Sequence, residues 1–595
     1  EDNTYLSYNA VIGTSVDAKL YLAFQILDYA LVMTPGAPVK QALLDAGIST
    51  DVYSSYETSL YQPVYSIVAK NSNSKEQDRF VSVINDTLEK LVKDGINERT
   101  IEAGINYYEF KYREADYGPY PKGLMYYLTM MDSWLYDETK PFIHIEAGDT
   151  FDELKKNARN GYFEKLIKEY LLDNNHKSII SLVPEYGLEK EKEQKEADKL
   201  AEYKSTLTND ELKELVKKTK ELKEYQDAPS SQEELEKIPM LELSDIKREP
   251  AKDYNDVKSV DGIKIVHHNI FTNKIAYINL SFDTKCVPDE LIPYMGLLGS
   301  TLSLMDTKNY TYPELTNEIN INCGGLATGT ALYSDKVDFS KNTIVYEVKS
   351  KALYEKVPFV LGMMEEIMYN TRFDDYKRLK EIIARIKSRL EASLMGQGHS
   401  IAMLECCAQF SESAYYSDIL RGYKYYEFIK KLDEEFEQNK TQIVDKLNKL
   451  VGYIFNKDNV IVSLTADDEG YDCFAKALSA KSCNIKDEHF NTAVRSFTPV
   501  NVKTGYTSAS QVQYVARCGN FVKDGYKYTG ALKVLKVIFS YDYLWINVRV
   551  KGGAYGCMSG SSRNGDFYMV SYRDPNLEKT NDIYEGAADY IRNFD

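Results

Sequence analysis

The interpretation of this chain starts from residues 541–576. This stretch begins Y-D-Y-L-W-I-N-V-R-V-K-G-G-A-Y-G-C-M-S-G and ends S-Y-R-D-P-N. An apolar run leads into the paired glycines Gly552 and Gly553, which allow a positive φ angle or the close approach of another surface. Residues 567–572 are typical of a β-strand. The pattern therefore predicts an apolar element, a tight glycine turn and a strand that follows it.

Two side chains with several hydrogen-bond donors flank this turn. Arg549 carries a guanidinium and Tyr555 a phenol, and the two residues are six positions apart. A pair of this kind can direct its donors into one cleft. The alternative is a loop with one surface arginine and one half-buried tyrosine, and short motifs alone do not exclude it.

The segments R-V-K-G-G-A-Y-G and S-Y-R-D-P-N closely resemble the last domain of the presequence-protease branch of the pitrilysin/insulinase zinc peptidases. The resemblance extends through nearly all of the chain, in the order of the family. It implies that Arg549 and Tyr555 reach across a closed chamber to the substrate. It also implies that the backbone at Gly552, Gly553 and Ala554 lines the substrate site.

Length and composition limit the possible classes of protein. A chain of 595 residues is expected to form several domains, and its 43% hydrophobic and 27% charged residues are typical of a globular protein. The net charge of −17 argues against nucleic-acid binding. No uninterrupted apolar run is long enough for a membrane span, so we expect no membrane partner. Eight scattered cysteines without a disulfide framework favour a reducing compartment, either a bacterial cytoplasm or an organelle matrix.

A pattern of two helices, one or two glycines and a strand occurs three times, at residues 21–47, 294–324 and 528–552. Repetition of a unit of this kind indicates duplication. We therefore predict an α+β fold of duplicated αβ domains, with antiparallel-rich sheets covered by helices. The expected divisions are a second peptidase-family domain, a charged helical hairpin and linker, a third domain and a partial fourth domain, over residues 1–187, 188–250, 251–492 and 493–595.

Two local predictions follow from composition. The charged segment 188–225 contains the capping box Thr208-Asn209-Asp210-Glu211, which indicates two helices in an antiparallel hairpin. The short apolar run at residues 178–183 predicts a buried strand.

The histidines do not supply the zinc motif of the family. Zinc peptidases of this kind use H-x-x-E-H on a helix, with a distant glutamate as third ligand. None of the six histidines begins that motif, and the adjacent His267 and His268 would point to opposite faces of a strand. We expect each of the six to be structural or exposed, with no metal site in this chain: His144, His176, His267, His268, His399 and His489.

The resemblance accounts for this absence. It implies that the chain is a fragment whose parent holds zinc in a first domain outside this sequence. The chain itself is expected to be inactive alone and to form the chamber portion of an endopeptidase that degrades short unstructured peptides. The expected partners are those peptides and the zinc-bearing domain. The alternative is a non-catalytic scaffold or peptide-binding relative of the same fold.

Overall fold

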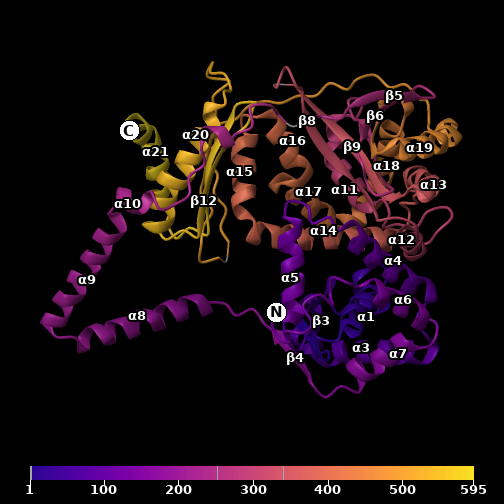
Figure 1. Cartoon of the computed structure of the whole chain (residues 1–595), viewed down its shortest axis with the longest axis horizontal. Helices are drawn as coiled ribbons and strands as arrows, with labels where there is room; N and C mark the ends of the chain where they lie inside the picture. Colours follow the sequence, from indigo (N-terminus) through magenta and orange to yellow (C-terminus); the bar gives the residue numbers. More distant parts are fainter. Residues whose placement is uncertain (1–2, 251, 340, 509, 595) are drawn as a thin grey trace.

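The computed structural model describes residues 3–250, 252–339, 341–508 and 510–594. The described strands form three separate sheets, and we name the segments around them the first, second and third units. In Figure 1 the first unit lies at the lower right, the second above it and the third to the left of the second. The units run from β1 (Thr4–Val11) to β4 (Lys177–Leu182), from β5 (Asp256–Val260) to α19 (Asp468–Lys481), and from β11 (Ala516–Asn520) to α21 (Glu578–Arg592).

The remaining strands of the first unit are β2 (Asp51–Glu57) and β3 (Val64–Ser72). Those of the second unit are β6 (Ile263–Asn269), β7 (Ile275–Asp283), β8 (Leu326–Ser334), β9 (Asn342–Leu353) and β10 (Val460–Ala466). Those of the third unit are β12 (Gly556–Ser561) and β13 (Asp566–Tyr572).

The three sheets share one connectivity. Their strand orders are β2-β3-β1-β4, β5-β6-β10-β7-β9-β8 and β11-β13-β12. In each unit a first strand (β1, β7 or β11) is followed by helices and then by an edge strand. The next strand along the chain pairs with both the edge strand and the first strand. All strand pairs between the described elements are antiparallel except β10 with β6. The duplicated, antiparallel-rich α+β fold predicted from the repeat is confirmed.

The helices of the first unit are α1 (Ala18–Asp28), η1 (Tyr29–Met33), α2 (Pro38–Asp45), α3 (Gln77–Asp94), α4 (Glu98–Glu114), α5 (Lys122–Trp134), α6 (Gly148–Asn157), α7 (Tyr162–Ile167) and η3 (Lys168–Leu172). Those of the second unit are α11 (Ile292–Thr301), α12 (Tyr312–Asn322), α13 (Val357–Tyr369), α14 (Tyr376–Gly396), α15 (Gly398–Ala408), α16 (Glu412–Arg421), α17 (Tyr423–Glu434), α18 (Phe436–Ile454) and the terminal α19. The third unit adds α20 (Ala531–Val537) and η9 (Ile538–Val550).

The segment from α1 to α2 forms the centre of the first core. The side chain of Asp17 accepts a hydrogen bond from the N–H of Leu20 at 3.0 Å and so caps α1. Residues Ala18–Asp45 are long and apolar enough to cross a membrane by length and composition alone, but 67% of the most apolar window is buried inside the structure. Phe24 within it is fully buried against the sheet residues of the same core. The apolarity of this segment is therefore used in core packing.

The charged segment after the first unit forms two exposed helices, α8 (Leu188–Thr206) and α9 (Asn209–Asp227). The predicted capping box is present, because Thr208 Oγ1 accepts from the N–H of Glu211 and the Glu211 carboxylate accepts from the N–H of Thr208. The prediction of an antiparallel hairpin is wrong in one respect. The helices diverge from their joint as a V instead of packing along their length (Figure 1). Neither helix buries a described residue, so no apolar contact holds them together.

Two further expectations need correction. The strand predicted at residues 178–183 is β4, but it lies at the sheet edge with Ile180 53% and Leu182 66% exposed. The burial of this strand was overestimated because apolar composition does not distinguish an edge strand from a central one. In the third unit the expected pair of helices is instead the continuous run of α20 and η9, the latter a π-helix.

Candidate active site

The glycine turn between η9 and β12 requires both of its glycines. A Cβ on Gly552 would lie 2.5 Å from the carbonyl oxygen of Val548 and 2.9 Å from that of Asn547, which leaves no room for a side chain. Gly553 has a φ angle of +81°, in the region that favours glycine. Its N–H donates to the carbonyl of Arg549 at 2.8 Å. The turn thus holds Arg549 at the end of η9 and Tyr555 just before β12.

The S-Y-R-D-P-N segment braces this turn from the other side. Asp574 is fully buried and accepts hydrogen bonds from the Thr580 hydroxyl at 2.7 Å and from the N–H of Asn576 at 2.8 Å. The Asn576 amide in turn donates to the carbonyl of Gly552 at 2.6 Å. The N–H of Tyr555 donates to the carbonyls of Tyr572 and Arg573. The two sequence segments that carry the family resemblance therefore form one hydrogen-bonded structure.

Arg549 is held by aromatic contacts. The centre of its guanidinium lies 4.1 Å from the ring centroid of Trp545 and 5.5 Å from that of Tyr555. Trp545 lies four residues earlier on η9, a spacing that places the two side chains on one face of the helix. Cation–π contact orients the guanidinium without using its N–H donors. Among the described residues, none forms a hydrogen bond or ion pair with the Arg549 side chain.

Tyr555 presents its phenol to solvent. Its side chain is 64% exposed, and its hydroxyl forms no hydrogen bond with any residue of the described chain. The ring lies edge-on to Tyr572 with centroids 5.9 Å apart. The structure therefore brings the donors of Arg549 and Tyr555 close together and leaves both sets without a protein partner in the described chain.

The substrate-binding role of Ala554 stays a prediction. Its side chain is 3% exposed within the third core, and its N–H donates to the carbonyl of Val548 at 3.1 Å. Its carbonyl is the group that a substrate could use. Gly552 and Gly553 are accessible, but the carbonyl of the first and the N–H of the second are already used within the turn. Their contribution is the close approach that the absence of side chains permits.

The neighbourhood of Tyr572 contains residues that sequence reasoning missed. His399, expected to be structural or exposed, lies in the first turn of α15 with its ring 4.9 Å from that of Tyr572. Desolvation lowers the pKa of His399, so a neutral ring is favoured. Tyr514 extends this cluster and donates its hydroxyl to the carbonyl of Met395 at 2.8 Å. Trp545 could have been found from its position four residues before Arg549 in a helical run.

The histidine rings are engaged in contacts within the protein. His267 is fully buried and its Nε2 lies 3.0 Å from the carbonyl oxygen of Ala466, whereas the ring of His268 contacts Ser463 and the carbonyl of Tyr254. The two rings occupy opposite faces of β6, as predicted. His144 is buried and contacts the Ser15 carbonyl at 2.7 Å. The described histidines therefore do not fit the zinc site of an H-x-x-E-H peptidase.

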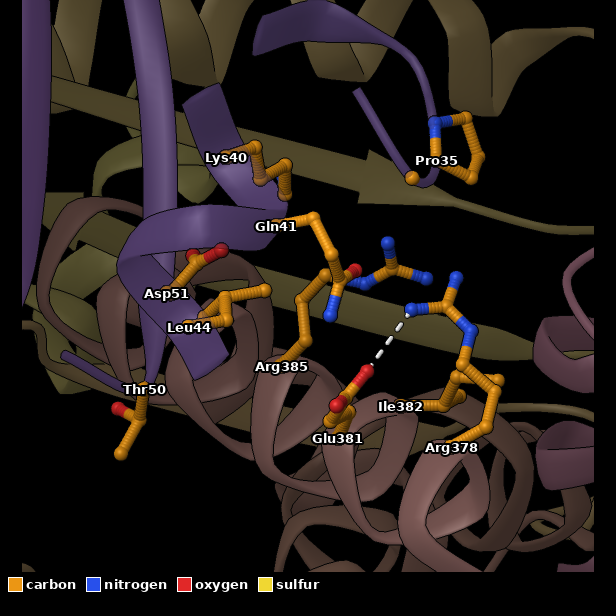
Figure 2. A pocket seen from close by; sticks show the side chains of 11 residues that line it. Pro35, Lys40, Gln41, Leu44, Thr50, Asp51, Arg378, Glu381, Ile382 and Arg385 are labelled. Carbon is orange, nitrogen blue, oxygen red and sulfur yellow. Dashed lines mark hydrogen bonds and ion pairs between the residues drawn. The ribbon is translucent and has the colours of Figure 1, made fainter. Parts of the chain in front are cut away.

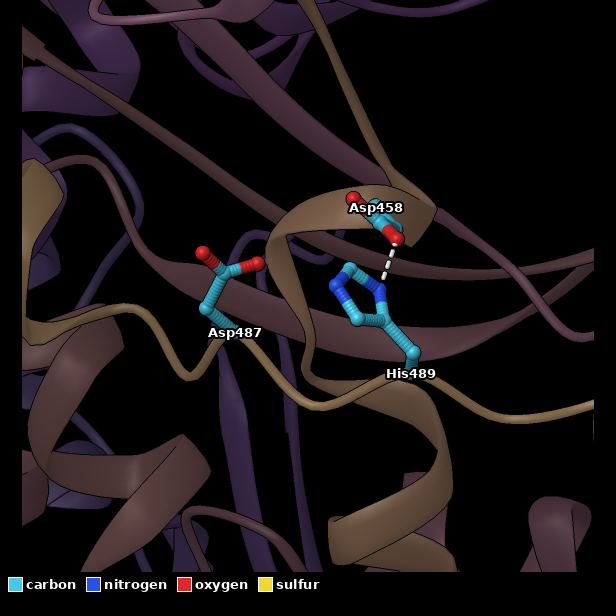
Figure 3. A group of neighbouring side chains, drawn as sticks. All are labelled: Asp458, Asp487 and His489. Atoms are coloured by element: carbon cyan, nitrogen blue, oxygen red, sulfur yellow. Dashed lines mark hydrogen bonds and ion pairs between the residues drawn. The ribbon is translucent and has the colours of Figure 1, made fainter.

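One group of possible ligands lies at the surface of the second unit. Ligand atoms of Asp458, Asp487 and His489 all lie within 4.8 Å of one another, and all three side chains are exposed. Figure 3 shows His489 directed at Asp458, with which its Nδ1 is paired. Exposed groups of this kind are common without a metal ion, and none of these three side chains is buried.

Comparison with known proteins identifies the family. The family described as associated with subfamily C of the M16 peptidases matches residues 182–432, and "PreP C-terminal domain" matches residues 505–595. The chain belongs to the presequence-protease-like branch of the M16, or pitrilysin-type, peptidases. The second match contains the whole turn with Arg549 and Tyr555. The first match includes the V of α8 and α9 and most of the second unit.

The relatives of this M16 chain come from bacteria and from eukaryotic organelles. It is 39% identical over 592 residues to Protein HypA of Clostridium perfringens, a match that covers 100% of this chain and 60% of that protein. It is 30% identical over 590 residues to "Presequence protease 1, chloroplastic/mitochondrial" of Arabidopsis thaliana, covering 98% of this chain and 54% of that protein. The mitochondrial presequence protease of Xenopus laevis is 23% identical, with 100% of this chain and 60% of that protein covered. The chain thus spans somewhat more than half the length of these relatives.

Proposed function

We propose that this chain forms the substrate-chamber portion of a zinc metalloendopeptidase that degrades short unstructured peptides. The observation that carries this proposal is the arrangement of Arg549 and Tyr555. Both side chains are held on one braced turn, and neither donates a hydrogen bond to a residue of the described chain. A rigid turn that displays unused donors is suited to a substrate with carbonyl oxygens.

The proposed chemistry of the two residues follows from their donors. Attack on a peptide carbonyl places negative charge on its oxygen, and the Tyr555 hydroxyl would donate a hydrogen bond to that oxyanion. The Arg549 guanidinium would bind a neighbouring substrate carbonyl or share the oxyanion. Gly552 and Gly553 would let the peptide backbone approach the turn. No metal step is assigned to this chain, because its histidines do not fit a catalytic zinc site.

The remaining parts of the proposal concern the complete protein. We assign residues 1–187, 188–250, 251–492 and 493–595 to the second domain, the connecting helices, the third domain and part of the fourth. Zinc would be held by a first domain outside these residues. A bacterial cytoplasm or an organelle matrix is the proposed compartment, in keeping with the free cysteines of the described chain.

The alternative is a scaffold that binds no reacting peptide. A scaffold does not need two adjacent side chains with unused donors, so the exposed phenol of Tyr555 favours the enzyme. The experiment is to compare the isolated chain with the complete protein after exhaustive dialysis, by metal analysis and a peptidase assay. We expect zinc and peptide cleavage in the complete protein alone. Stoichiometric zinc and cleavage in the isolated chain, or neither in the complete protein, would contradict the proposal.

A further inference from the structure

A small cationic cavity lies where the first unit meets the second. Its walls come from α2 and the start of β2 on one side and from α14 on the other. Figure 2 shows the guanidinium groups of Arg378 and Arg385 close to each other, with Lys40 and Gln41 across the cavity. The lining residues are Pro35, Gly36, Lys40, Gln41, Leu44, Thr50, Asp51, Arg378, Glu381, Ile382 and Arg385.

The cationic groups of this cavity are buried (Lys40 and Arg378) or half-buried (Arg385), and they are incompletely paired. Arg378 is 6% exposed; its Nε donates to the carbonyl of Leu304 at 3.0 Å and its Nη1 to Glu381 at 3.1 Å. Its Nη2 is buried and has no hydrogen-bond partner. Arg385 forms no hydrogen bond or ion pair with any residue in the described ranges. Lys40 is 9% exposed and donates to the carbonyl of Val52 at 2.7 Å.

The charges of the lining do not balance. Three cations (Lys40, Arg378 and Arg385) face two carboxylates (Asp51 and Glu381), which leaves one positive charge in excess. Burial, opposed by Asp51 and reinforced by the neighbouring arginines, lowers the pKa of Lys40 to about 8. Burial and the nearby Arg389 and Arg378 likewise lower the pKa of Arg385 to about 10. An uncompensated buried charge is costly, and a bound anion would remove that cost.

The room in the cavity suits a small anion. The centre of a water-sized sphere can move through about 10 Å³ of it, so a single ion somewhat larger than a water molecule, such as chloride, fits between the side chains. We propose that this cavity binds a chloride ion, held by Arg378 Nη2, the Arg385 guanidinium and the Lys40 ammonium.

Chloride bound here would join the two units. Lys40 belongs to the first unit, and both arginines belong to α14 of the second. The neighbouring contacts already cross the same interface, because Lys377 pairs with Asp45 at 2.6 Å and Lys70 donates to the carbonyl of Ser388 at 3.1 Å. Neutralising the excess charge would remove the repulsion between groups that these contacts bring together. Chloride would therefore stabilise the docking of the first unit on α14.

The test compares anions at equal ionic strength, with the whole chain. Thermal unfolding is followed in sodium chloride, sodium bromide and sodium gluconate, since gluconate cannot enter the cavity. We expect a saturable rise in Tm on the order of 2 °C with either halide relative to gluconate, because an ion that binds only the folded state stabilises it. Equal Tm values in all three salts would overturn the proposal. Crystals grown with bromide should show an anomalous peak between Arg378 and Arg385, and a water molecule without bromide there would also overturn it.

Two substitutions in α14 separate binding from general salt effects. Arg385→Gln removes a cation that has no partner in the described chain, so the variant should fold, lose the halide effect and be at least as stable as the unmodified chain in gluconate. Lys380→Gln removes an exposed charge of the same helix, one that pairs with Glu437 of α18, and should keep the halide effect. If Arg385→Gln is destabilised equally in every salt and retains the halide effect, the cavity does not bind chloride.

Discussion

The guanidinium of Arg549 stacks on the indole of Trp545 with 4.1 Å between the charged centre and the ring centroid. This cation–π contact leaves the N–H groups of the guanidinium available. The exposed ring of Tyr555 lies on the same side of the turn, 5.5 Å from the guanidinium centre. The proposed substrate contacts therefore depend on a helix face and a glycine turn that act together.

Replacing Arg549 with lysine should impair the complete enzyme severely. A lysine ammonium has no planar fork and cannot stack on Trp545 while it donates two parallel hydrogen bonds. Loss of one charged hydrogen bond costs about 1.5–3 kcal/mol, so we expect kcat/KM to fall roughly 10- to 100-fold. Arg592→Lys, at an exposed pair with Asp589, is the control and should leave kcat/KM unchanged. A normal kcat/KM for Arg549→Lys would show that the enzyme does not use the paired N–H donors of the Arg549 guanidinium.

Gly552→Ala should destabilise the chain, because the new Cβ would meet the carbonyl oxygen of Val548 at 2.5 Å. Overpacking of this kind costs about 1–3 kcal/mol, measurable as a shift of the urea unfolding midpoint. Gly556→Ala is a matched control, since its Cβ would meet only Tyr572 at an ordinary 3.7 Å. Equal midpoints for the two variants would contradict the described turn.

Stability should fall as the pH drops below the ordinary histidine pKa. His144 is buried and its ring stacks on Tyr21 at 3.9 Å. Desolvation lowers its pKa below 6.5, against the opposing effects of the Ser15 carbonyl and Asp132. The unfolded chain therefore takes up the proton first. The contribution of His144 is complete above about pH 6.5 and is lost as the pH falls from there through the lower pKa of the folded state.

The measurement for His144 is the free energy of unfolding in urea between pH 7.5 and pH 5.5. The loss on acidification should be smaller in His144→Gln than in the unmodified chain. The exposed residue His176 offers the control His176→Gln, which should show the unmodified loss. An identical loss in all three proteins would remove His144 as a source of the pH dependence.

Much of the fold could be predicted from the sequence where periodicity was strong. The apolar residues of α3 and α4 recur at helical spacing, and the buried faces of these helices include Phe80 and Ile101. Strand β1 was missed, although Leu6 and Tyr8 alternate inward, because serine, asparagine and tyrosine weaken the pattern. The π-helical form of η9 could not be predicted, since it differs from an α-helix in hydrogen bonding and hardly in composition.

The candidate site was predicted in part. Arg549 and Tyr555 came from the resemblance, and the structure places them together on one turn. The bracing role of Asp574 and the contact of Trp545 with Arg549 were not predicted. Both depend on contacts between side chains, and a motif shows only that the residues are close in the sequence. The substrate-binding role of Ala554 stays a prediction, since its position in a motif does not reveal which of its groups a substrate would contact.

The most direct test of the central claim is the steady-state kinetics of Tyr555→Phe in the complete enzyme. The variant keeps the ring against Tyr572 and loses only the hydroxyl, so it should fold normally. If that hydroxyl donates to the developing oxyanion, kcat should fall by about 10²–10³ with little change in KM, because ground-state binding does not use the bond. A well-folded Tyr555→Phe enzyme with near-normal kcat would contradict the assignment of this turn to the active site.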